Sequence, residues 1–542
     1  MLTYFCTKHF LILKKIQEFF RGFMQKFKSM CVSAIVPTIV SALIFFLNYF
    51  CFGMENIMIA PFATLAFLRF RNMTNHYACM GKNYLIFLAM TGLAFVASIN
   101  LPLCILVNAF AFFWLAYSLI DEYNPVNYFP AGMALIFFQM KPVADLAGLA
   151  NRAIALSASM LIVFVFIAIL AYRSKSKDPI ADNIRLGLAN CQNQMHAYLE
   201  HDTTKLDVLH QELRAINSRI TDEIYHYNRS TMRAVGRINW YCRYVALFQV
   251  INYFTSQDYN EEEYQTIADT LQRFTRQFET VRPTADYKQL HFRNNKPSRQ
   301  SFRFRFAMRL LIVMTPCMAF ASAADLENSF WLVISVFFMM IPVSDNTKNR
   351  VKQRVLGTCA GIVICFVLFS IFTQFPGRAA LMLLSNFMIY ASTSYAMMVT
   401  YITCSALAIQ TIDAAIGVVL WQRLLYTLIG AVIAVLANKC IFQIRTRKEM
   451  VILIERLDGI RNELVNVSDE TYPDPDERQH YTDELVIKSY MLMKRLQTYN
   501  ATISHREKED PSAPDSFAVY EKKYMGFMAA YLKDHLLEKM PL

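Results

Sequence analysis

The sequence predicts an all-α polytopic membrane protein built from two parallel six-span repeats, with helical cytoplasmic domains attached. Its 542 residues are 55% hydrophobic, and the mean hydropathy is +0.27. Acidic and basic side chains are missing from 84 to 120 and again from 379 to 412. About 20 apolar residues cross the hydrocarbon core of a bilayer, so each run is long enough for two crossings.

Twelve apolar segments predict about 12 transmembrane helices, six in each half. The first membrane repeat, 31–172, contains segments near 31–51, 57–68, 84–99, 101–120, 129–140 and 153–172. The second, 305–443, contains segments near 306–323, 329–343, 356–374, 379–394, 396–412 and 423–443.

The two halves share residues at a nearly constant offset, which indicates an internal repeat. Met-Glu-Asn at 54–56 matches Leu-Glu-Asn at 326–328, and Arg152 matches Arg423. Six spans return the chain to its starting side, so the halves have parallel topology around an axis along the membrane normal. A substrate path between the halves follows from this arrangement.

The distribution of Lys and Arg predicts the orientation. The loops placed inside hold thirteen Lys and Arg, and those placed outside hold four. Basic residues concentrate on the cytoplasmic side, so both termini are predicted to be cytoplasmic in a bacterial inner membrane. Residues 1–30 form a basic N-terminal segment, either an amphipathic helix on the inner leaflet or a plain basic flank.

Two polar segments, 173–304 and 444–542, are predicted to form helical cytoplasmic domains. Apolar residues step by three and four in the first of them, as on one face of a packed helix. The aromatic and basic stretch 225–244 is interpreted as a helix lying against the inner face of the membrane.

Several function classes are excluded. The net charge of +12 is explained by basic flanks of membrane spans, so no nucleic-acid partner is expected. The twelve Cys are scattered without metal or CxxC spacing, which predicts neither a metal site nor disulfides. The chain has no phosphate-binding loop and no hydrolase motif, so no cofactor and no enzymatic activity are expected.

The stretch FWLVISVFFMMIPVSDNTKNRVKQRVLGTCAG (330–361) resembles the signature of the fusaric acid resistance and aromatic acid exporter superfamily. An aromatic span ending near a proline leads to a basic turn and then to an Arg-x-x-Gly-Thr-x-x-Gly segment, here Arg354, Gly357, Thr358 and Gly361. The resemblance implies export of aromatic carboxylic acids such as p-hydroxybenzoate. Plant aluminium-activated malate channels look like relatives of this superfamily that contain a single repeat.

An aromatic carboxylate needs an apolar wall and a cation, and a charge inside a span is unfavourable unless it has a role. The candidate substrate-binding residues are Arg152, Arg423, Arg354, Arg350 and Trp331. Each candidate has an alternative interpretation. Arg152 and Arg423 could instead extend to lipid phosphates at the membrane interface, and Arg350 and Arg354 could belong to a basic turn that sets the topology. Trp331 could occupy an ordinary core or lipid-facing position.

Four carboxylates are candidates for proton coupling, with helix or loop capping as the alternative: Asp413, Asp145, Glu327 and Glu55. Five residues are assigned to helix packing or to broken helices: Gly357, Thr358, Gly361, Pro61 and Pro342.

Together these features predict a secondary transporter that exports organic anions, above all aromatic carboxylic ones, driven by the proton gradient or membrane potential. An organic-anion channel and a non-transport envelope or scaffold protein are the alternatives. The expected partners are a small organic anion and membrane lipids. A homo-oligomer and a periplasmic adaptor both stay open.

Overall fold

The computed structural model describes residues 28, 30–71, 76–120, 126–173, 179–230, 237–258, 260–280, 301–324, 326–343, 346–410, 416–467, 474–504 and 514–533. These residues form helices and turns, without a strand. The chain divides into two compact units. The membrane unit is Met1–Arg71, Lys82–Ile169 and Ser298–Ile444, and the polar unit is Asn72–Gly81, Leu170–Pro297 and Arg445–Leu542. The predicted N-terminal amphipathic segment, 1–30, lies almost entirely outside the described residues.

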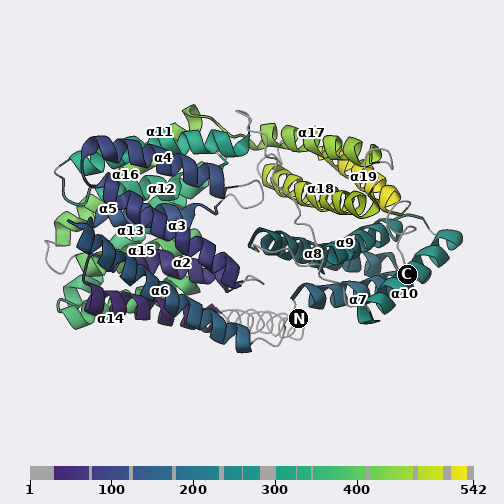
Figure 1. The fold of residues 1–542 in the computed structure, drawn as a ribbon, viewed down its shortest axis with the longest axis horizontal. Coiled ribbons are helices and arrows are strands. Elements are labelled where there is room, and N and C mark those ends of the chain that lie inside the picture. The colour runs from purple at the N-terminus through teal and green to yellow at the C-terminus, as the bar shows by residue number, and fades with distance from the viewer. Residues whose placement is uncertain are drawn as a thin grey trace, which may run out of the picture. The chain divides into compact units, whose positions relative to one another are not determined.

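Helices occupy the predicted apolar segments of the membrane unit (Figure 1). The first half contains Met30–Phe52, whose last turn is the π-helix η1 (Asn48–Phe52), then α2 (Ile59–Phe70), α3 (His76–Ala97), α4 (Leu101–Leu119), α5 (Phe129–Met140) and α6 (Leu146–Arg173). The second half contains α11 (Phe302–Ala323), α12 (Phe330–Met339), α13 (Thr347–Ile371), α14 (Phe375–Ala391), α15 (Tyr395–Gln410) and α16 (Ile416–Cys440).

Helix length separates these helices into two kinds. Among the described residues, seven helices are long and apolar enough to cross a membrane, whereas α2, α5, α12 and α15 are shorter. The 10 to 12 residues of α2, α5 and α12 rise about 15–18 Å, and the 16 and 17 residues of α15 and α14 rise about 24–26 Å, all short of the ~30 Å hydrocarbon core. Pro61 stands in the first turn of α2, and Pro342 follows the end of α12. The structure is therefore that of a polytopic membrane protein, and the count of twelve crossings stays a prediction.

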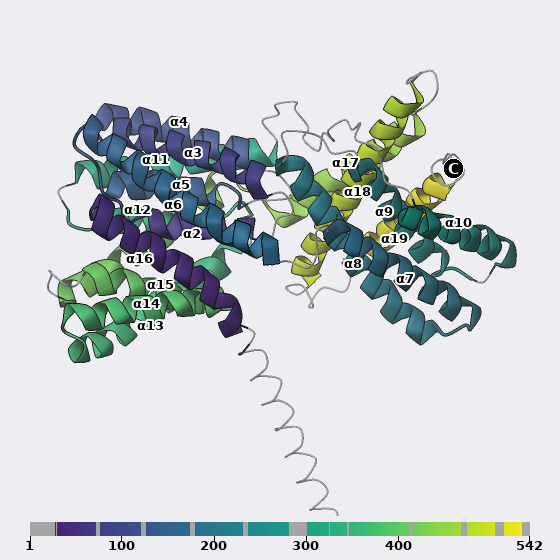
Figure 2. The same ribbon diagram turned by 60° about the horizontal axis from the view of Figure 1, so that its bottom comes forward.

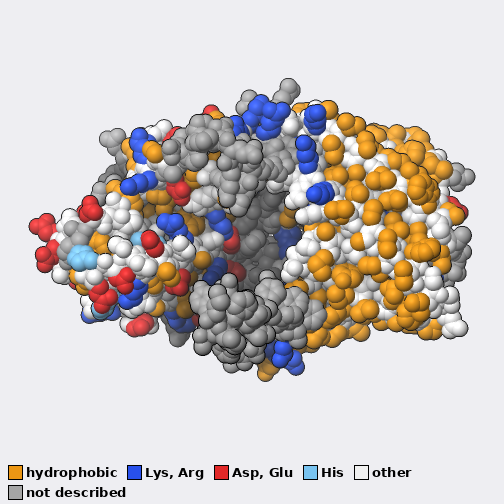
Figure 3. Space-filling view, turned by 180° about the vertical axis from the view of Figure 1, so that it is seen from behind, with side chains coloured by type: hydrophobic (Ala, Val, Ile, Leu, Met, Phe, Trp, Pro, Cys, Tyr) orange, Lys and Arg blue, Asp and Glu red, His pale blue; other side chains and the backbone are white. Residues whose placement is uncertain are grey.

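The outer surface of the membrane unit is apolar. Figure 3 shows hydrophobic side chains over most of this unit's visible face, with Lys and Arg gathered at one edge of it. The exposed apolar residues come from many helices and include Leu85, Phe110, Leu161, Val363 and Phe366. A soluble protein rarely exposes so large a continuous apolar surface, which fits contact with lipid.

The closest helix packing in the second half joins α13 to α15, which lie side by side with α14 in both ribbon views (Figure 2). A Cβ built on Gly357 would lie 2.5 Å from the carbonyl oxygen of Ala396, and one on Gly361 would lie 2.8 Å from that of Thr400. Small residues four apart allow two membrane helices to approach at backbone distance. Gly357 and Gly361 therefore set the spacing of α13 and α15.

Replacing Gly357 by Ala should lower thermal stability, because the new methyl meets a backbone carbonyl that cannot rotate away. Overpacking of this kind costs about 1–3 kcal/mol. The matched control is Gly417→Ala on α16, where a Cβ has nothing within 4 Å. That change should be neutral or slightly stabilising, since Ala is the better helix former. Equal melting temperatures for the two purified variants in detergent would contradict the predicted close approach.

The polar unit brings both polar segments of the sequence into one compact body. Its helices are α7 (Pro179–Leu199), α8 (Thr203–Ser230), α9 (Arg237–Phe254), α10 (Glu261–Thr280), α17 (Thr446–Val465), α18 (Pro475–Ser504) and α19 (Pro514–Leu532). Helix α9 packs against α7, α8, α10, α18 and α19.

This central position overturns one expectation, that the stretch 225–244 lies against the membrane face. Tyr241 and Tyr244 are buried in the polar unit, as are Val245, Phe248 and Ile251 of the same helix. The aromatic residues that looked like a membrane-facing surface therefore belong, from Tyr241 onward, to a helix core. The first residues of the stretch lie outside the part whose side chains are described.

Asp483 is an unusual buried carboxylate in the polar unit, on α18. It is 2% exposed, accepts a 3.1 Å hydrogen bond from Gln479, and its Oδ2 has no partner. Burial raises its pKa to about 7, although the nearby Arg243 opposes the shift. In an unfolded chain an Asp titrates near 3.9. Between these two values the folded protein binds more protons than the unfolded one, so stability falls as pH rises toward 7 and is flat above it.

Asp483→Asn should therefore melt at a higher temperature than the original protein above pH 7, and the gap should close toward pH 4. Three pKa units correspond to an upper limit of about 4 kcal/mol. The control is Asp222→Asn, which removes an exposed 2.6 Å ion pair with Lys494 and should shift stability by at most about 1 kcal/mol. If the difference in melting temperature between Asp483→Asn and the original protein did not change with pH, the buried carboxyl would not be neutral near pH 7.

Candidate functional site

Helix α12 supplies the aromatic wall of the candidate site. Trp331 and Phe338 stand seven residues apart, two helical turns, so they share one face at a separation of about 10 Å. The guanidinium of Arg423, from α16, lies 4.4 Å from the Trp331 ring centroid. That of Arg354, from α13, lies 4.7 Å from the Phe338 ring centroid. Two predicted substrate-binding arginines therefore stack along one aromatic face.

A third arginine, Arg350, joins them one helical turn before Arg354. Its guanidinium lies 3.2 Å from the centroid of the Tyr395 ring, and its Nε donates to the Phe338 carbonyl oxygen at 3.4 Å. Arg354 Nη1 donates to the Tyr395 hydroxyl at 3.3 Å. We name Arg350, Arg354 and Arg423 the arginine cluster.

Two members of the arginine cluster, Arg354 and Arg423, are buried and incompletely paired, whereas Arg350 is half-buried. Arg354 is 0% exposed and Arg423 is 2% exposed. Within the part of the chain that the structure describes, Nε and Nη2 of Arg354 and Nε of Arg423 have no hydrogen-bond partner. Arg354 and Arg423 are each other's electrostatic neighbours, and no described carboxylate forms an ion pair with the cluster. An isolated buried charge is unfavourable by several kcal/mol.

Arg152 has a different environment from Arg423, although the two occupy matching positions in the halves. Its Nε donates to Asn56 Oδ1 at 3.1 Å and its Nη1 to the Phe138 carbonyl oxygen at 3.0 Å. Nη2 donates to the carbonyl oxygens of Glu55 and Lys141. Arg152 thus fastens the end of α5 to the turn before α2. The structure groups Arg423 with Arg354 and Arg350, and the contacts of Arg152 are those of a structural clamp.

The carboxylates predicted to couple protons lie at turns. Glu55 and Glu327 are exposed, each in the turn that precedes a short helix. Their backbone carbonyls accept hydrogen bonds from the last helix of the same half, from Arg152 and from the Tyr426 hydroxyl respectively. Asp145 caps α6, since its Oδ1 accepts from the Gly148 amide at 2.7 Å. These contacts fit the capping alternative. Asp413 lies outside the described residues.

Sequence reasoning missed Tyr395, Arg309 and Tyr128. No sequence pattern marks Tyr395 as a site residue, because only the packing of α15 against α13 brings its ring to Arg350. Arg309 was detectable as an isolated charge within an apolar segment. Tyr128, from the turn before α5, is fully buried and donates to the Met340 carbonyl oxygen at 2.9 Å. It connects the first half to the end of α12.

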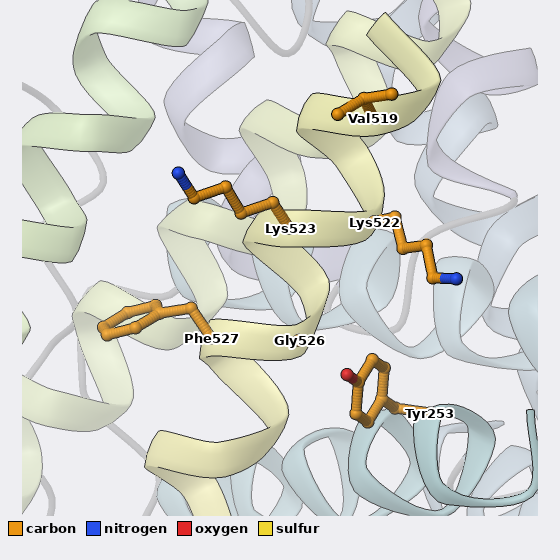
Figure 4. A pocket seen from close by; sticks show the side chains of 6 residues that line it. All are labelled: Tyr253, Val519, Lys522, Lys523, Gly526 and Phe527. Atoms are coloured by element: carbon orange, nitrogen blue, oxygen red, sulfur yellow. The ribbon is translucent and has the colours of Figure 1, made fainter. Parts of the chain in front are cut away.

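A pocket in the polar unit is a weaker candidate. It has a volume of about 490 Å³ and lies between Tyr253 of α9 and residues of α19, among them Lys522, Lys523 and Phe527. The two lysine side chains extend in opposite directions and are exposed (Figure 4). They do not converge on one ligand position.

Comparison with known proteins places the arginine cluster in a matched region. Residues 316–437 match the family described as Fusaric acid resistance protein-like. An uncharacterized protein of Haemophilus influenzae is 30% identical over 136 residues, which are 24% of this chain and 19% of the relative. Inner membrane protein YccS of Escherichia coli is 26% identical over 137 residues, 25% of this chain and 19% of the relative.

A protein of Neisseria gonorrhoeae, uncharacterized protein ORF2, is 33% identical over 61 residues, 11% of this chain and 15% of the relative. The matched segments thus span about a fifth or less of each relative's length. No solved structure matches the chain. The resemblance read from 330–361 is confirmed for that part of the chain: residues 316–437, which contain the whole arginine cluster, match the Fusaric acid resistance protein-like family.

Proposed function

We propose that this protein is a secondary transporter that exports small organic anions, with aromatic carboxylates as the leading class. The observation that carries the proposal is the arginine cluster, which holds buried, unpartnered guanidinium N–H groups over the Trp331 and Phe338 rings. A carboxylate would complete the hydrogen bonds of two guanidinium groups, because their planar N–H pairs match its geometry. An aromatic ring on the same molecule would pack on the wall of α12.

The helix arrangement supports a path built from two related halves. In each half the second and fifth helices are short. Helix α4 of the first half packs on α11, the first helix of the second half. Conversely, Tyr390 of α14 lies within hydrogen-bonding reach of Ser41, on the first helix, and Thr64. Such reciprocal pairing is what a pseudo-two-fold axis along the membrane normal requires.

Placement in the inner membrane is supported by the Escherichia coli relative, which is an inner membrane protein. The excess of Lys and Arg in alternate loops supports cytoplasmic termini and a cytoplasmic polar unit. In that orientation Arg350 and Arg354, near the start of α13, face the inner mouth of the path. Export coupled to protons or to the membrane potential follows, since an anion leaves a negative interior downhill.

The direct test measures retention of labelled p-hydroxybenzoate in cells with and without the protein, in the presence and absence of a protonophore. Faster loss that the protonophore suppresses is the result expected of a coupled exporter. Faster loss that the protonophore leaves unchanged identifies a channel. Identical retention in both strains removes p-hydroxybenzoate as a substrate, and other organic anions and the scaffold alternative are then the candidates to test.

A further inference from the structure

Two thiols meet in the interface between α13 and α15. Cys365 is 1% exposed and Cys404 is 6% exposed. Their side chains interact with each other, and Cys404 Sγ also contacts the Gly361 carbonyl oxygen at 3.6 Å. Both are free thiols. Neither belongs to the arginine cluster.

The register of the two helices explains why the thiols face each other. Gly357 lies against Ala396 and Gly361 against Thr400, with backbone atoms in near contact at both levels. Four residues further on each helix, the same step reaches Cys365 and Cys404. Because the helices run in parallel and pack at glycine distance, this third level brings two Cβ atoms together. A disulfide forms only where the two Cα atoms lie within about 7 Å and the Cβ atoms point toward one another.

We propose that Cys365 and Cys404 form a redox-active dithiol, a modification site that closes to a disulfide between α13 and α15. Both S–H bonds break and one Sγ–Sγ bond forms, and the two protons and two electrons pass to a small uncharged two-electron acceptor. An uncharged acceptor is required because the pair lies among apolar helices.

The disulfide links α13 to α15 covalently, one helical turn after Gly361 on α13. Sliding of one helix along the other then stops, because the crosslink fixes the register that the glycines only permit. The reduced pair leaves this motion open. The site is a property of the helix interface and does not depend on which anion the protein carries.

The test uses the purified full chain, reduced, washed and treated with diamide, a neutral acceptor of two electrons and two protons. After denaturation the remaining thiols are alkylated and the digest is analysed by mass spectrometry. We expect that Cys365 and Cys404 are both no longer alkylated after diamide treatment and that their two peptides appear linked to each other. Cys317, a buried thiol of α11, is the internal control and should still be alkylated after diamide treatment.

Two variants make the result decisive. In Cys365→Ser, Cys404 should remain alkylated after diamide, and in Cys404→Ser the same should hold for Cys365. The proposal is overturned if both thiols of the original chain remain alkylated to the extent of Cys317, or if Cys365 is found linked to Cys359 instead.

Discussion

Replacing Arg423 by Gln is expected to abolish anion export without harming the fold. A charge-assisted hydrogen bond contributes about 1.5–3 kcal/mol, so losing one guanidinium should weaken anion binding roughly 10- to 150-fold. Among the described residues Arg423 Nε has no hydrogen-bond partner, and the guanidinium contacts the Trp331 ring. Removing its buried charge should therefore leave the melting temperature unchanged or raise it. The measurements are export of labelled p-hydroxybenzoate and thermal unfolding of the purified variant.

The matched control is Arg152→Gln at the corresponding position of the first half. Arg152 donates to Asn56 and to three backbone carbonyls, so its loss should lower stability sharply. The two variants should thus diverge, one folded and inactive, the other poorly folded. If Arg423→Gln exports at the original rate, the arginine cluster is not on the anion path.

Replacing Arg309 by Met is expected to prevent stable folding of the membrane unit. Its guanidinium donates to the carbonyl oxygens of Ile341 and Pro342, after α12, and of Ile441 and Phe442, after α16. It also donates to Asn438 Oδ1 at 2.7 Å. Each carbonyl left buried without a donor costs about 1–3 kcal/mol, so the total loss should exceed about 3 kcal/mol.

Folded protein recovered by size-exclusion chromatography in detergent is the measurement, with Arg303→Met as control. Arg303 lies on the same helix, is partly buried and has a 5.6 Å contact with the Tyr117 ring. Its loss should have a small effect. Arg309→Lys should rescue only part of the yield, because an ammonium lacks the planar fork of five donors. Full recovery of Arg309→Met would show that water replaces the guanidinium.

Most of the helix positions could be predicted from the sequence. Apolar segments and their boundaries are local properties, since the length of an uncharged run and the charges that flank it decide whether a segment can cross lipid. The predicted segments near 101–120 and 129–140 correspond closely to α4 and α5. The end of the stretch 225–244, from Tyr241 onward, was misread because aromatic and basic residues suit a membrane surface and a helix core alike, and only tertiary packing distinguishes the two.

The sequence by itself determined that Arg152 and Arg423 are charges in equivalent places of two apolar halves. The tertiary structure decided their difference. Backbone carbonyls at the end of α5 converge on Arg152 and accept hydrogen bonds from its guanidinium. Around Arg423 the corresponding space is taken by Trp331 and by a second cation, Arg354. Partners of a buried charge come from segments far apart in the chain, so residue spacing cannot reveal whether its hydrogen bonds are satisfied within the protein or left for a ligand.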